Sequence, residues 1–190
     1  MKHAVSALVL SLLLCSVPAF SQEGMEAYME MMKPGPEHEL LEKMAGSWEL
    51  EGKIWQTPGA QPMEFSGKAD HHMILGGRFV QMDSKSGEGE MYTESMVIMG
   101  YDRRHKEFTY VGFDTWGTYF VTAKGAYDKA SRSWSLEGQD VDPVMGFTQN
   151  YIFRFSMPDD DRMTVEVIFI DFPGVEEKEY KMLEMNYSRL

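Results

Sequence analysis

From residue 47 onward, apolar side chains recur at every second position, and no stretch with a helical repeat interrupts them. In one clear case Met163, Val165, Val167 and Phe169 are separated by single residues that include polar Thr164. Side chains two positions apart lie on the same face of a strand, so each such segment buries one face and exposes the other. The chain therefore predicts an all-β fold.

Clusters of Gly, Pro, Asp and Ser divide this region into about ten strands. Short links between consecutive strands favour antiparallel hairpins, which together form a meander. A meander of this size removes its exposed edges most simply by closing, so we expect a β-barrel rather than an open sheet or a sandwich. The predicted strands cover residues 47–56, 62–73, 77–85, 91–101, 106–114, 117–127, 132–140, 146–156, 162–171 and 178–188.

Two of the predicted turns resemble each other and support the hairpins. One strand ends on Tyr101-Asp102 and another on Tyr127-Asp128, and a polar turn follows each. The return strand then opens with an aromatic residue, Phe108 in the first and Trp134 in the second. Two similar turns are too few to indicate a repeat protein.

The first 21 residues are typical of a secretory signal peptide. Met1-Lys2-His3 is a short basic head, a largely apolar run extends from Ala4 to Leu14, and small residues follow at Ala19 and Ser21. This pattern predicts export to the periplasm or the exterior after cleavage near Ala19 or Ser21. The apolar run is too short for a permanent membrane-spanning helix, and no second apolar segment approaches that length.

Residues 22–35 are acidic and rich in Met, and Pro34-Gly35-Pro36 interrupts them, so we interpret this segment as a flexible lead-in. The barrel domain is then predicted to span residues 36–190. It opens with one short helix over residues 37–44, which has early acids, a late Lys43 and a helical stop at Gly46. The methionines of the lead-in resemble thioether clusters that bind Cu(I), but the general abundance of Met explains them equally well.

Charge and cysteine content exclude several classes of function. The only cysteine, Cys15, belongs to the predicted signal, so the mature chain has neither disulfides nor thiol chemistry. The formal net charge is −12, and it becomes about −13 once Lys2 is removed with the signal. Such a charge argues against partnership with nucleic acid or with an anionic membrane surface.

Four sequence segments resemble a known bacterial family, the one called domain of unknown function 1579. The resemblance runs in order from about residue 34 to the end of the chain. The segment Ile74-Leu75-Gly76-Gly77-Arg78-Phe79 is its most specific part. The four segments are Pro34 to His38, Leu41 to Trp48, Met73 to Phe79 and Gly100 to Asp102.

The resemblance implies a calycin-like barrel, the superfamily that includes lipocalins, fatty-acid-binding proteins and haem-binding nitrobindins. Gly46-Ser47-Trp48 is similar to the Gly-x-Trp start of lipocalin barrels, which implies that Trp48 closes the base of the barrel. Nitrobindin-like relatives bind haem through a histidine on a late strand. No histidine lies in the last four predicted strands, so we expect neither haem nor another cofactor. The function of the family itself is not established.

The interior of the barrel is the predicted site of function. His71 shares a face with Phe65, Gly67 and Ala69, so we expect it to point inward, whereas Arg154 points outward. An apolar cavity with a few polar groups is typical of a small-ligand site, and a barrel of about ten strands has room for one. The candidate ligand-binding residues are His71, Tyr110, Trp116, Tyr119, Phe147, Gln149 and Tyr151.

Two other classes of function stay open. In the first class, the aromatic side chains fill a solid core. The protein is then a structural or interaction module that uses an exterior face around Val111, Phe113 or Phe120. The second is catalysis. His71 is its only candidate centre, and the sequence contains no established catalytic motif. No catalytic residue and no metal site are predicted, and the oligomeric state is not predicted either.

Overall fold

The structure is a computed structural model, and it describes residues 22–142 and 144–190. The predicted signal peptide lies outside the described residues. The chain divides into two compact units, of which the first ends at Met32 and the second spans Lys33–Leu190. The described part of the first unit contains the helix α1 (Gln22–Met31), a segment that was predicted as a lead-in without regular structure.

The second unit contains one short α-helix, α2 (Pro36–Glu42), followed by ten strands. A single turn of 3-10 helix, η1 (Gly89–Met91), interrupts the link between the third and fourth strands. The strands are β1 (Gly46–Ile54), β2 (Met63–Ile74), β3 (Phe79–Ser86), β4 (Thr93–Asp102), β5 (Glu107–Asp114), β6 (Phe120–Asp128), β7 (Ser133–Val141), β8 (Thr148–Ser156), β9 (Arg162–Ile170) and β10 (Glu179–Arg189).

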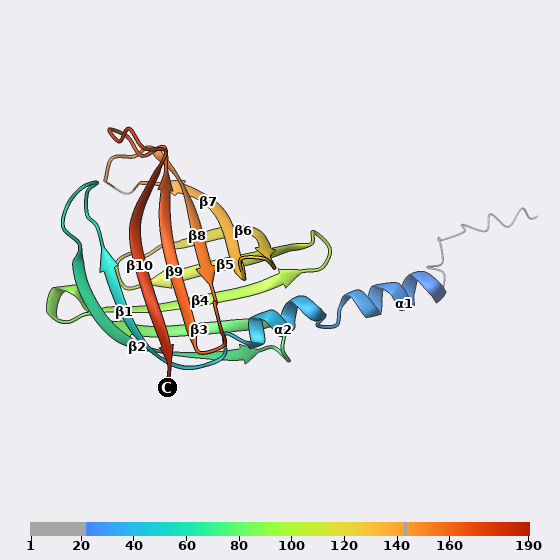
Figure 1. Cartoon of the computed structure of the whole chain (residues 1–190). Coiled ribbons are helices and arrows are strands. Elements are labelled where there is room, and N and C mark those ends of the chain that lie inside the picture. Colours follow the sequence, from blue (N-terminus) through green and yellow to red (C-terminus); the bar gives the residue numbers. More distant parts are fainter. Residues whose placement is uncertain (1–21, 143) are drawn as a thin grey trace, which may run out of the picture. The chain divides into compact units, whose positions relative to one another are not determined.

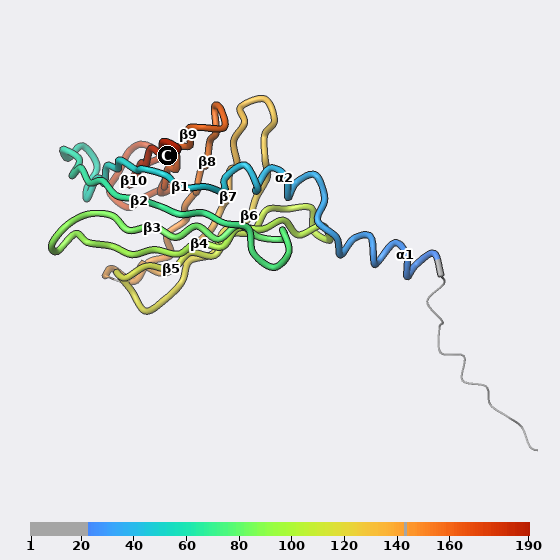
Figure 2. Tube along the Cα trace, turned by 90° about the horizontal axis from the view of Figure 1, so that it is seen from below, coloured from blue at the N-terminus to red at the C-terminus, as the bar shows by residue number. Residues whose placement is uncertain are grey.

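All ten strands pair antiparallel with their neighbours in the chain, and β10 pairs with β1 to close the barrel (Figures 1 and 2). The closing register places Trp48 opposite Arg189 and Ile54 opposite Leu183. Each predicted strand matches an observed one to within three residues at either end. The prediction of a closed antiparallel meander with a short N-terminal helix is therefore confirmed.

The alternation that predicts the strands also separates the two faces of the barrel wall. In β1 the buried residues are Trp48, Leu50 and Gly52, and the residues between them are exposed. The same pattern continues on β8, where Tyr151 and Phe153 face the core. Burial of these inward rows is the main source of stability for such a sheet, because each strand removes one apolar face from water.

Helix α2 and the residues after it cover one end of the barrel. Helix α2 packs against the strands β2, β3 and β4, and its Leu41 is fully buried together with the following Met44. Pro36 occupies the first turn of the helix, where its missing N–H leaves no hydrogen bond unmade. We call this end, which lies where β1 begins and β10 ends, the closed end.

Arg189 joins the last strand to the junction between α2 and β1. Its guanidinium donates to the carbonyl oxygens of Lys43 and Ala45, at 2.8 and 2.7 Å, and it lies 4.2 Å from the centre of the Trp48 ring. Gly46 has a φ of 138°, and a Cβ atom there would meet Arg189 Nη1 at 2.2 Å. Glycine is therefore required at this position by both its backbone conformation and its close contact with Arg189.

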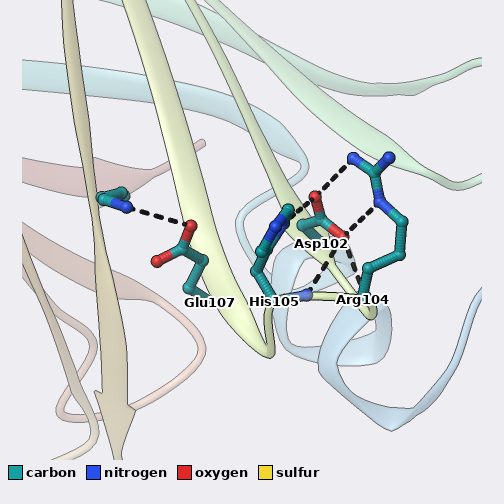
Figure 3. Close-up of polar contacts among 5 residues, drawn as sticks. Asp102, Arg104, His105 and Glu107 are labelled. Carbon is teal, nitrogen blue, oxygen red and sulfur yellow. Dashed lines mark hydrogen bonds and ion pairs between the residues drawn. The ribbon is translucent and has the colours of Figure 1, made fainter.

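The two similar turns of the sequence adopt similar structures at the closed end. In the β4–β5 turn Asp102 accepts hydrogen bonds from the backbone and guanidinium of Arg104, and it also contacts the His105 ring (Figure 3). The Arg104 guanidinium and the His105 ring hold the pKa of Asp102 well below its usual range. Asp128 caps the β6–β7 turn in the same way by accepting from Ala130 and Ser131.

Candidate functional site

The barrel encloses a cavity of about 440 Å³ that is lined by residues from all ten strands. Most of the wall is apolar, with Val97, Phe153, Val165 and Val167 among its members. The volume falls in the range of ordinary small-molecule sites. At roughly 30 Å³ per water, it corresponds to the space of about fifteen waters.

The floor of the cavity is formed at the closed end. The carbonyl oxygen of Met44 lies 3.1 Å from both Trp48 Nε1, which donates to it, and His71 Nδ1. The His71 ring lies 6.0 Å from the Trp48 ring and 5.8 Å from the Tyr187 ring, measured between centroids. Trp48 is fully buried, so this cluster seals the barrel at that end.

His71 is a neutral hydrogen-bond acceptor toward the cavity. Because a carbonyl oxygen can only accept, the contact with Met44 fixes the proton on Nδ1 and leaves Nε2 with a lone pair. Burial lowers the pKa of His71 to about 4, so the ring is uncharged at neutral pH. The side chain lines the cavity, and Nε2 has no hydrogen-bond partner in the described part of the chain.

Three aromatic side chains, Tyr110, Phe153 and Tyr151, pack together in the cavity wall. The Tyr110 ring stacks on Phe153 at 4.3 Å, and Tyr151 meets the edge of the same Phe153 ring at 5.3 Å. The Tyr151 hydroxyl donates to the Thr122 carbonyl oxygen, which holds the ring in place. Burial raises the pKa of Tyr110, so its hydroxyl stays protonated.

A strip of hydroxyl groups on β3 and β4 belongs to the cavity wall but was not among the predicted site residues. Ser84, Ser86, Thr93 and Ser95 line the cavity, and the Ser84 and Ser95 hydroxyls lie 2.7 Å apart. Their signal in the sequence is the alternation of Ser84 and Ser86 with charged Lys85. The predicted wall rested on aromatic side chains, so this polar part of it was not predicted.

The opposite end of the barrel is the mouth of the cavity. Trp116, Tyr119 and Val141 line the cavity and are still 60%, 53% and 61% exposed, so the cavity opens to solvent there. Trp116 Nε1 donates to the Thr93 hydroxyl, which fixes the indole at the rim. The neighbouring Val144 is 89% exposed, so the rim presents apolar surface to water.

Three carboxylates line the cavity at the mouth, namely Asp114, Asp140 and Asp142. Each accepts at least one hydrogen bond from a nearby backbone amide, and Asp142 accepts from both Val144 and Met145. Gln149 lies beside them, opposite Asp140 in the β7–β8 register, and donates to the carbonyl oxygens of Asn150 and Ile170. Its Oε1 is buried without a hydrogen-bond partner among the described residues.

The comparisons with known proteins identify the family. The family described as "Protein of unknown function (DUF1579)" matches residues 33–189. The chain belongs to this family. A comparison with curated proteins found no match. The crystal structure of Rv2717c from M. tuberculosis is similar, with a TM-score of 0.58 and 15% identity over 83% of this chain and 99% of that one. At this identity the likeness shows the fold alone.

Six of the seven predicted ligand-binding residues of this DUF1579 domain line the cavity, whereas Phe147 does not. Phe147 precedes β8, which begins at Thr148, and its ring packs against Phe172 at 5.9 Å. The alternation that places Gln149 and Tyr151 inside therefore does not extend to Phe147. Arg154 points outward as expected and pairs with Glu166 at 3.3 Å.

No group of three or more His, Cys, Asp or Glu side chains that could bind a metal ion occurs among residues 22–142 and 144–190. His72 and His105 lie on the outer surface, and His38 of helix α2 packs against Tyr101. Within the same residues, no helix is both long and apolar enough to cross a membrane. His71 is thus the one histidine that the described structure brings to the cavity.

Proposed function

We propose that this DUF1579 protein is exported and binds a small, mostly apolar molecule inside its barrel. The observation that carries the proposal is the cavity of about 440 Å³, with an apolar wall, a sealed floor and an open mouth. Apolar surface that stays in contact with water is costly, and a ligand that fills the cavity removes it from water. The packed rings of Tyr110, Phe153 and Tyr151 supply an aromatic binding surface.

The interaction module with a filled core is the alternative. The exposed rings of Phe113 and Phe120 on neighbouring strands, 5.9 Å apart, favour a partner at that outer face. A solid core, however, leaves no space of this volume inside the barrel. The cavity therefore supports ligand binding in preference to this alternative.

Binding is tested with the neutral fluorescent probe N-phenyl-1-naphthylamine. We expect saturable fluorescence enhancement at one site per chain, because the probe is largely apolar and small enough for the cavity. Val97→Phe places a ring in the cavity and should weaken binding at least about tenfold, since one ring takes up much of the volume.

Ile98→Phe is the matched control for this test, because Ile98 is the next residue of β4 and points to the outer face. It should bind the probe as the wild type does. Equal enhancement from the wild type and Val97→Phe would show that the probe binds outside the barrel, which contradicts the proposal. Circular dichroism spectra of all three proteins establish that each is folded.

Export is tested by the N-terminal sequence of the protein recovered from the periplasmic fraction or the culture medium. We expect the first residue to be Phe20 or Gln22, because small residues at Ala19 and Ser21 precede the two cleavage positions. Recovery of the chain from the cytoplasm with Met1 in place would contradict export. Replacement of Leu12 and Leu13 by Arg, which breaks the apolar run, should retain the protein in the cytoplasm.

A further inference from the structure

The charges around the cavity are of one sign. No Lys or Arg from residues 22–142 and 144–190 lines it, and its only charged side chains are Asp114, Asp140 and Asp142 at the mouth. No ion pair joins any of these three carboxylates to a described Lys, Arg or His. A carboxylate ligand would therefore enter past negative charges and find no cation inside to compensate its own.

The interior offers acceptors to a neutral ligand instead. His71 Nε2 keeps an unshared lone pair because Nδ1–H is used by the Met44 carbonyl oxygen. His71 lines the floor, beside the rings of Trp48 and Tyr187, at the end of the cavity opposite the aspartates. A hydroxyl group at the tip of an apolar chain can reach Nε2 while the chain fills the apolar wall.

The cavity selects among ligands through the cost of leaving a buried polar atom without a hydrogen bond once water is expelled. If an apolar ligand fills the cavity without a donor, water is expelled and His71 Nε2 is left without a partner. The Ser84 and Ser95 hydroxyls share one hydrogen bond at 2.7 Å, and the hydroxyl that accepts in it still has a proton to donate, so this pair does not require a donor from the ligand. The other acceptor without a partner, Gln149 Oε1, lies beside the aspartates at the mouth, so at the floor of the cavity the requirement for a donor falls on His71 Nε2.

We infer that the ligand is an uncharged amphiphile whose hydroxyl or similar donor bonds to His71 Nε2 at the floor, and that the three aspartates of the mouth exclude carboxylates. This inference rests on the proposed function and names its ligand class. It separates this barrel from a carrier of fatty acids, which requires a cation for the acid group. The volume corresponds to about fifteen waters, which is enough for a chain of about ten carbons.

The test compares three molecules of similar length as competitors of N-phenyl-1-naphthylamine: decan-1-ol, 1-methoxynonane and decanoate. We expect decan-1-ol to bind about tenfold more tightly than the ether, which lacks the donor, and at least about tenfold more tightly than decanoate. Titration calorimetry with decan-1-ol gives the affinity directly.

Two variants assign the effects to residues. In His71→Leu the Met44 carbonyl oxygen keeps the Trp48 donor but the acceptor Nε2 is removed, so decan-1-ol and the ether should bind within about threefold of each other. In the triple variant Asp114→Asn, Asp140→Asn and Asp142→Asn, each side chain keeps an oxygen for its backbone amide bonds. Decanoate should then approach decan-1-ol in affinity.

The outcomes separate the inference from the proposed function. If the wild type binds the fluorescent probe but decanoate competes as well as decan-1-ol, the ligand class is wrong and binding in the barrel stands. The same holds if none of the three molecules competes, or if His71→Leu still prefers the alcohol tenfold. If the wild type binds neither the fluorescent probe nor decan-1-ol, both fall.

Discussion

Replacing Trp48 by Ala should lower the free energy of unfolding by about 4 kcal/mol, the largest effect that we expect from a single substitution. Trp48 is fully buried, donates to the Met44 carbonyl oxygen and lies under the Arg189 guanidinium. The substitution leaves a void at the closed end, removes a hydrogen bond and takes away the surface on which Arg189 rests. Urea unfolding followed by circular dichroism measures the loss.

Trp116→Ala is the matched control, because the same residue type is 60% exposed at the mouth. It should cost less than about 1 kcal/mol, as surface substitutions ordinarily do. If the Trp48→Ala variant does not fold, Trp48→Phe keeps a ring at the closed end and should lose about 2 kcal/mol. Equal stability of the Trp48 and Trp116 variants would contradict the role of Trp48.

Lowering the pH from 6.5 to 4 should cost about 3 kcal/mol of stability through His71 alone. The pKa of His71 is lowered to about 4 by burial, whereas an unfolded histidine titrates near 6.5. Between these two values only the unfolded state takes up the proton, so the stability is fully present above pH 6.5 and falls as the pH decreases toward 4. Burial also lowers the pKa of His38, which adds to the loss in the same direction.

The measurement is urea unfolding at pH 7 and pH 5, a window in which the carboxylates contribute little. His71→Asn keeps a donor for Met44 but has no titrating ring, so it should lose about 2 kcal/mol less than the wild type across this window. His72→Asn, on the outer face of the same strand, serves as the control and should behave as the wild type does. A His71→Asn variant with the wild-type difference would show that another group is responsible.

The barrel could be predicted because the alternation of apolar and polar residues within each segment indicates a strand without reference to the rest of the chain. Ile54, Leu136 and Val165 each occupy the inward position that a period of two assigns to them. The short links then leave few topologies other than a meander. Helix α1 was not predicted, because Pro34 and the acidic, Met-rich composition of the segment indicate a loose lead-in.

The site was predicted less completely, because its details depend on contacts between distant residues. His71 could be placed inside by alternation, but its bond to Met44 depends on how the chain turns from α2 into β1. The contact of Arg189 with Lys43 and Ala45 spans nearly the whole domain. Phe147 was assigned to the inward face because the alternation was extended to the residue before β8 begins.

The pairing of β1 with β10 has a consequence for biosynthesis. The ribosome synthesises β1 long before β10. Until β10 is made, the edge of β1 that pairs with it, around Leu50, has a row of backbone N–H and C=O groups without partners. Closure brings together residues that are more than a hundred positions apart, and such long-range contacts form slowly. The charged residues Glu49, Glu51 and Lys53 along that unpaired edge disfavour pairing with a second chain. The same alternation that marks the outer face of the finished barrel thus also protects the nascent chain from aggregation.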